Sequence, residues 1–206
     1  MLTNKLYGVI FDLDNTLVSS SLNFDKIKAV LGCPSEINIL DHVNSLPQRD
    51  QPSANKILVD YEMQDAQQTV KLIGVDDLLH FLCQRNIRCA VVTRNCRQAA
   101  LLKMANNRIQ IPLLLTREDH KAKPAPDALL YIANHWQLSP ENMLCVGDYL
   151  YDLQAAKNAN MLSCLVTNGT VVDYAHLANI VVANLAELKQ SIALSFSTTE
   201  AEQISD

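Results

Sequence analysis

The sequence has 206 residues, of which 49% are hydrophobic and 19% charged, and its formal net charge at pH 7 is -5. This length allows one substantial core, or one core with a small accessory domain. The acidic balance argues against a nucleic-acid-binding surface. No apolar run is long enough to cross a bilayer and the N-terminus lacks a signal-peptide pattern, so we expect a cytoplasmic protein without a membrane partner. The six cysteines form no CxxC pair, which argues against a zinc site or a disulfide framework.

An apolar run from Leu6 to Phe11 predicts a short buried strand that ends at two aspartates, Asp12 and Asp14. A buried strand that delivers two carboxylates loses stability unless a cation or a substrate pairs with them. The alternative is an ordinary turn, because Asp and Asn are common turn residues. This stretch alone does not decide between the two interpretations.

The next stretch, residues 20–73, contains no convincing strand. Apolar residues recur at helical spacing around Ile27, Val43 and Leu58, which predicts three helices. A stretch of more than fifty residues is too long to be a simple loop in a compact domain. Helical inserts of this length are usually lids or accessory domains. We therefore expect a helical cap over residues 20–73, with Ser and Gly at its joints suited to a lid hinge.

From residue 74 the pattern changes to alternating helices and strands, which predicts an α/β fold: a Rossmann-like, doubly wound and mostly parallel sheet. We expect the core to comprise residues 1–19 and 74–195, and residues 196–206 to form a frayed or disordered tail. The expected helices are 76–85, 96–106, 126–136, 151–160 and 185–194, and the expected strands after the first are 87–92, 112–115, 143–146, 162–166 and 180–182.

Polar residues follow several of the predicted strands directly. Thr93 ends one strand, and Asp148 ends another and is followed by Asp152 at helical spacing. Ligands of open α/β sheets bind at the carboxyl ends of strands, so these residues and the two N-terminal aspartates are expected to meet. Each acid taken singly could instead cap a helix. Lys123 precedes a proline, so its ammonium could be aimed into the acid cluster, although a solvated lysine in a turn is the alternative.

Together these segments resemble the four motifs of the haloacid dehalogenase-like phosphohydrolase superfamily, in the right order. They are Asp12-x-Asp14-x-Thr16, Thr93, Lys123-Pro124 and Gly147-Asp148-x-x-x-Asp152. The helical insert after the first motif looks like the small C1-type cap of the phosphoglycolate phosphatase-like group. The sequence departs from many relatives at three places, namely Asn15 for Gly, Arg94 between Thr93 and Asn95, and Asn160-Met161 for Ala-Gly.

The resemblance implies roles for the matching residues. Asp12 would attack phosphorus to give an aspartyl-phosphate, and Asp14 would act as general acid and base. Mg²⁺ would lie between Asp12, Asp148 and the backbone carbonyl of Asp14, with Asp152 in support. Thr93, through its hydroxyl and its backbone N–H, and Lys123 would hold the phosphoryl group. The further residues expected to bind substrate are Thr16, Arg94 and Asn95.

The function so implied is Mg²⁺-dependent hydrolysis of a small phosphorylated metabolite, with the cap choosing the substrate. A phosphotransferase or sugar-phosphate mutase would use the same phosphoenzyme, and a catalytically silent binding module is a further alternative. Asp14 and the pair Asp148 and Asp152 argue against a true dehalogenase, which needs no second acid and no metal. Contacts of Arg49 or His120 with substrate, and the choice between monomer and homodimer, stay open.

Overall fold

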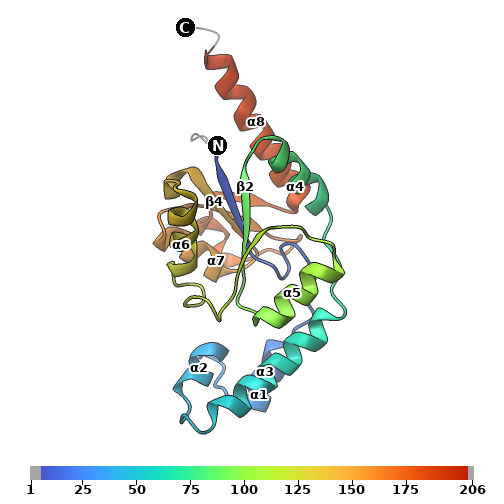
Figure 1. Cartoon of the computed structure of the whole chain (residues 1–206), viewed down its shortest axis with the longest axis vertical. Coiled ribbons are helices and arrows are strands. Elements are labelled where there is room, and N and C mark those ends of the chain that lie inside the picture. Colours follow the sequence, from blue (N-terminus) through green and yellow to red (C-terminus); the bar gives the residue numbers. More distant parts are fainter. Residues whose placement is uncertain (1–5, 204–206) are drawn as a thin grey trace.

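A computed structural model of the chain describes residues 6–203, and side chains as far as residue 196. Its centre is a six-stranded sheet in the order β3-β2-β1-β4-β5-β6, and every pair of neighbours is parallel (Figure 1). The chain leaves the central strand in one direction and later returns to its other side, so the topological switch point lies between β1 and β4. The strands are β1 (Gly8–Phe11), β2 (Arg88–Val92), β3 (Leu113–Leu115), β4 (Met143–Gly147), β5 (Leu162–Val166) and β6 (Ile180–Val182).

Helices cover both faces of the sheet, so the predicted doubly wound α/β fold is confirmed. One apolar cluster joins the sheet to α4 (Val75–Gln84), α5 (Arg97–Asn106) and α8 (Leu185–Gln203). A second cluster on the opposite face joins it to α6 (Asp127–Trp136) and α7 (Leu150–Asn158). Two short 3-10 helices, η1 (Pro140–Asn142) and η2 (Asp173–Leu177), complete this part. No helix within residues 6–203 combines the length and the apolar character that crossing a membrane requires.

The last helix is longer than the sequence suggested. We expected it to end near residue 194 and residues 196–206 to be frayed, but α8 continues to Gln203. Leu185, Leu188 and Ile192 are fully buried against the sheet, and a helix fixed at one end in this way propagates at low cost. Residues 1–5 of the expected core and residues 204–206 lie outside the described residues.

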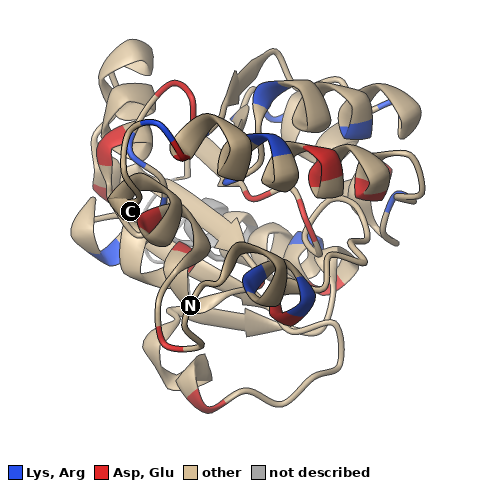
Figure 2. Cartoon of the chain, turned by 90° about the horizontal axis from the view of Figure 1, so that it is seen from below, with Lys and Arg blue, Asp and Glu red and all other residues tan. Residues whose placement is uncertain are grey.

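The insert forms three helices beyond the carboxyl ends of the strands, where Figure 1 shows them as a separate lobe. They are α1 (Phe24–Leu31), α2 (Ile39–Ser45) and α3 (Gln51–Ala66). The lobe has an apolar cluster of its own, made of Ile27, Cys33, Ile39, Val43, Ala54 and Leu58. In the view from below, basic and acidic segments are interspersed over the helices (Figure 2).

The joints of the insert differ from the free hinges that their Ser and Gly residues suggested. Val18 and Lys71 form an antiparallel bridge, and Ser19 N donates to the carbonyl of Val70 at 2.8 Å. In addition, α3 packs against α5 through an apolar contact that includes Ala66 and Ala99. The incoming and outgoing segments are therefore held together. Their backbone hydrogen bonds restrict the rotation that Ser and Gly would otherwise allow.

The carboxyl half of α3 also carries two buried acids, Glu62 and Asp65, that pair with cations of the core. Glu62 Oε2 accepts from the backbone N of Cys96 at 3.0 Å, and its other oxygen pairs with Arg117. Asp65 pairs with Lys103 of α5 at 2.7 Å. Buried charges are tolerated only when paired, so these contacts fix the carboxyl end of α3 to the core.

Gly74 lies where the chain leaves the insert, at a tightly packed position. Its φ is 89°, and a Cβ there would lie 2.6 Å from the backbone N of Ala186. Gly32 also has a positive φ, of 63°, but no described atom lies within 4 Å of its Cβ position. Gly32→Ala should therefore lower the free energy of unfolding only by the left-handed penalty of about 1 kcal/mol. Gly74→Ala should lower the free energy of unfolding by more, because the added Cβ also clashes with the backbone of Ala186. Thermal unfolding measures both variants, and equal losses of stability would contradict this packing.

Candidate active site

Three carboxylates gather at the switch point of the sheet. Asp12 follows β1, Asp148 follows β4, and Asp152 lies in the first turn of α7. One oxygen of each lies within 4.8 Å of the others, so the sequence correctly predicted that these acids meet. The close approach depends on Gly147, since a Cβ at this position would lie 2.2 Å from the Asp152 carboxyl carbon. We call these three residues the acid triad.

Lys123, in the loop before α6, supplies the cation of this cluster. Its ammonium donates to Asp12 Oδ1 at 2.6 Å, to Asp152 Oδ1 at 2.5 Å and to the carbonyl of Val92 at 2.8 Å. All three N–H groups are thus satisfied, as a side chain that is only 3% exposed requires. Burial alone would lower the pKa of Lys123, but the charges of Asp12 and Asp152 outweigh it and raise this pKa.

The acid triad carries more negative charge than one ammonium neutralises. Burial, together with the charges of Asp12 and Asp152, raises the pKa of Asp148 to about 8. Burial and Asp12 also raise the pKa of Asp152, to about 6, although Lys123 opposes the shift. Carboxylate oxygens in this number are the ligands that Mg²⁺ prefers, so the donor set fits the metal implied by the sequence motifs.

Asp14 lies outside the triad and faces a second buried lysine. Its Oδ1 accepts from Lys103 Nζ at 2.5 Å and its Oδ2 from Asn95 Nδ2 at 2.5 Å. Burial raises the pKa of Asp14 and Asp12 adds to the shift, while Lys103 opposes it. The side chain of Asp14 is thus engaged within the protein, and a metal contact through its backbone carbonyl stays a prediction. The turn that follows the two aspartates uses Asn15 at φ 52°, a conformation that Gly and Asn tolerate, which explains Asn where many relatives have Gly.

Lys103 was not predicted from the sequence. It lies on the buried face of α5, one turn after Ala99 and beside Met104. A lysine at a buried helical position is rare unless it is paired, and this placement was the signal that helical periodicity offered.

Thr93 fits its expected place only in part. Its hydroxyl accepts from the backbone N and the side-chain amide of Asn95, at 3.2 and 2.9 Å, and retains its own proton. The backbone N–H of Thr93, however, donates to the carbonyl of Leu115 at 3.0 Å. The predicted contact of this N–H with a phosphoryl group is therefore wrong, because the pairing of β2 with β3 continues through Thr93. Asn95 uses its amide within the protein, on Thr93 and Asp14.

Arg94 joins the insert to the core. It donates to the carbonyl of Lys123 and, at 2.7 Å, to Oδ1 of Asn38, the residue that caps α2. Its guanidinium lies 4.6 Å from the centre of the Tyr151 ring. Because both of its terminal nitrogens donate to neighbouring groups and its guanidinium lies over the Tyr151 ring, Arg94 shapes the boundary between the insert and the lysine loop.

A cleft of about 690 Å³ lies at this boundary. Its walls come from α2 and α3 of the insert and from the loops around Lys123, and both Arg94 and His120 belong to it. Arg49 is not among its lining residues; its Nε lies 3.6 Å from Asp50 on the surface. The residues that the insert contributes are Leu40, Asp41, Val43, Asn44 and Asn55.

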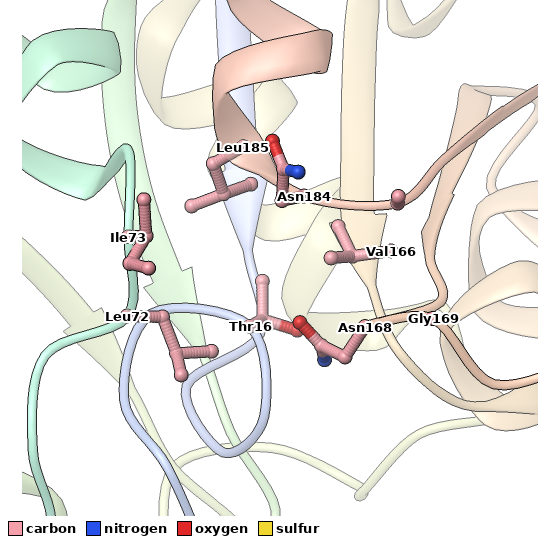
Figure 3. Close-up of a pocket in the computed structure, with 9 residues that line it drawn as sticks. Thr16, Leu72, Ile73, Val166, Asn168, Gly169, Asn184 and Leu185 are labelled. Carbon is pink, nitrogen blue, oxygen red and sulfur yellow. The ribbon is translucent and has the colours of Figure 1, made fainter.

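Thr16 lies apart from the acid triad. It is fully buried, and its hydroxyl is, among the described side chains, a buried polar group without a hydrogen-bond partner. Figure 3 shows it beside Leu72 and Asn168, in a different pocket of about 390 Å³ whose lining includes no member of the triad. The turn after Asp14 folds back on itself, with Leu17 N donating to Leu13 O at 2.9 Å, and directs Thr16 away from the predicted substrate position.

Comparisons with known proteins identify the family of this chain. The family model described as haloacid dehalogenase-like hydrolase matches residues 19–166. A haloacid dehalogenase-like hydrolase domain-containing protein of Arabidopsis thaliana is 33% identical over 174 residues, which cover 79% of this chain and 71% of the relative.

Solved structures show the same fold. A hydrolase from Pseudomonas syringae superposes with a TM-score of 0.78 at 19% identity, over 91% of this chain and 98% of that one. A predicted phosphoglycolate phosphatase from Haemophilus somnus superposes with a TM-score of 0.72 at 18% identity, over 92% and 99% of the two chains. By the match of the family model and the identity to the plant relative, this chain belongs to the haloacid dehalogenase-like hydrolase family.

Proposed function

We propose that this hydrolase is a Mg²⁺-dependent phosphatase that cleaves a small phosphorylated metabolite through an aspartyl-phosphate. The observation that carries the proposal is the placement of Asp12, whose Oδ1 is bound by the buried Lys123 ammonium within the acid triad. A carboxylate so held is oriented and lies beside a positive charge, as suits a nucleophile that attacks a phosphoryl group. Its family membership and the phosphatase among its structural neighbours support the assignment.

Catalysis would proceed in two displacements. In the first, a carboxylate oxygen of Asp12 attacks phosphorus, the bond to the ester oxygen breaks, and Asp14 gives that oxygen a proton. In the second, Asp14 takes a proton from water, whose oxygen attacks the same phosphorus and releases inorganic phosphate from Asp12. The Thr93 hydroxyl and Lys123 would hold phosphoryl oxygens during both steps. Mg²⁺, held by Asp12 and Asp148 with support from Asp152, would neutralise charge on the phosphoryl group.

The insert would recognise the organic part of the substrate. Residues of α2 and α3 face the cleft, whereas Asp12, Asp14, Lys123 and Asp148 all belong to the core. A lid beside the reacting phosphoryl group excludes water. It can also contact the organic part of the substrate, which the catalytic residues do not recognise.

Replacement of the nucleophile provides the first test. Asp12→Asn keeps the shape of the side chain but removes its charge, so turnover of an aryl phosphate with Mg²⁺ should fall by roughly three orders of magnitude or more. Asp60→Asn, on the solvent side of α3, should retain full activity. Near-normal turnover by Asp12→Asn would rule out the covalent route, and transfer of phosphate to an added sugar instead of its release would identify a phosphotransferase.

The charge of the acid triad makes a prediction for the metal-free protein. The pKa of Asp148 is raised from 3.8 to about 8, so the folded protein holds a proton that the unfolded chain has lost above pH 4. Stability should therefore fall as the pH rises between these two values. Asp148→Asn should flatten this fall in thermal unfolding experiments.

Mg²⁺ should oppose the same repulsion. At pH 8 a saturating concentration should raise the melting temperature of the parent protein by several degrees, with NaCl of equal ionic strength as the control. The Asp148→Asn variant should show little of this rise. An equal rise in both proteins would place the metal elsewhere.

The role of the insert is best tested by point substitutions. Removing all of it would leave Lys103 and Arg117 without their buried partners Asp65 and Glu62. Asn44→Ala and Asn55→Ala alter exposed residues that line the cleft. We expect both to change the ranking of KM values across a panel of phosphorylated metabolites while kcat for a small aryl phosphate stays the same. An unchanged ranking would mean that these parts of α2 and α3 do not contact substrate.

A further inference from the structure

One buried ammonium links the proposed acid–base residue to the insert. Lys103 is fully buried, and its Nζ lies 2.5 Å from Asp14 Oδ1, 2.7 Å from Asp65 Oδ2 and 3.4 Å from Asn95 Oδ1. Burial would lower the pKa of Lys103, but the two carboxylates outweigh this and raise it, so the side chain stays charged. One charge thus holds an acid of the core and an acid of the insert at the same time.

Asp65 is fixed in turn by the joint through which the chain enters the insert. Its Oδ1 accepts from the backbone N and the hydroxyl of Ser21, at 2.7 and 2.9 Å, and its Oδ2 accepts from the hydroxyl of Ser20 at 3.0 Å. Every acceptor site of Asp65 is thereby occupied by the joint or by Lys103. The position of the Lys103 ammonium therefore depends on how α3 and the joint are seated.

The orientation of Asp14 depends on the same group. One of its oxygens is bound by Lys103 and the other by Asn95, whose amide is also anchored on the Thr93 hydroxyl. A proton donor acts only within hydrogen-bond reach of the leaving oxygen, and a misplacement of about 1 Å can cost roughly a hundredfold in rate. Losing either donor would free the carboxylate to turn.

We propose that Lys103 is a positioning residue for Asp14, and that Asp65 seats Lys103, so that the insert sets the orientation of the acid–base carboxylate. The inference rests on the proposed function, since it concerns the step in which Asp14 protonates the leaving group. A purely structural ion pair would stabilise the fold without acting on that step. The two roles differ in how the effect of a substitution depends on the leaving group.

The test compares 4-nitrophenyl phosphate, whose leaving group needs no proton, with glycerol phosphate, whose leaving group does. Phosphoenzyme formation is measured in single turnovers with Mg²⁺. Lys103→Met should slow the reaction of glycerol phosphate about 10- to 100-fold, which is less than or equal to the smallest typical contribution of general acid catalysis, and that of the aryl ester far less. Asp65→Ala should act in the same direction, which keeps the test valid if Lys103→Met fails to fold.

Glu62→Ala is the matched control. It also removes a buried carboxylate of α3 that pairs with a core cation, but the partners of Glu62 are Arg117 and the backbone N of Cys96, not Lys103. It should lower the melting temperature without changing the ratio of the two rates. Equal losses on both substrates for Lys103→Met and Asp65→Ala, or a changed ratio for Glu62→Ala, would overturn the inference.

A double-mutant cycle gives a second readout. If Lys103 acts through Asp14, adding Lys103→Met to Asp14→Asn should cause little further loss with glycerol phosphate. Fully additive losses would show that the two residues act independently and would overturn the inference. A parent protein that forms no phosphoenzyme would overturn the proposed function as well, whereas active variants with an unchanged ratio overturn the inference alone.

Discussion

The site depends on one constraint, which is that the three carboxylates of the acid triad gather around a single buried ammonium that binds only two of them. Lys123 donates two of its N–H groups to Asp12 and Asp152. The third donates to the carbonyl of Val92, at the end of the neighbouring strand, so the ammonium is held in place on three sides. The sheet thus supplies the geometry and the lysine loop supplies the charge. The imbalance that remains falls on Asp148, which explains why a divalent cation suits the cluster.

Much of this arrangement follows from the sequence. The alternation of helices and strands after residue 74 and the apolar run before Asp12 fix a parallel sheet, and parallel strands bring their carboxyl ends to one edge. The sequence alone therefore predicts that the acids and Lys123 lie together. Asn15 and Asn160, two of the departures from many relatives, both have a positive φ, which Asn tolerates better than most residues other than Gly.

What could not be predicted are the pairings between distant segments. Lys103 meets Asp14 and Asp65 across 89 and 38 positions of the chain, and periodicity within one helix carries no information about such partners. The local sequence around Glu62 and Asp65 gives no sign that both side chains are buried. The full length of α8 could not be predicted for a related reason. Local composition does not reveal that the first turns of this helix pack against the sheet, which stabilises the turns that follow.

The two buried pairs between α3 and the core also limit how this protein can be recombined. Helical inserts of this kind are natural units to exchange between related enzymes, because they enter and leave the core at one place. Here an exchange would remove Glu62 and Asp65 but leave Arg117 and Lys103 behind, each buried and without its counter-charge. In a functional chimera, the residues at positions 103 and 117 of the core would have to be exchanged together with the insert. In related sequences, these acid and base positions should change together.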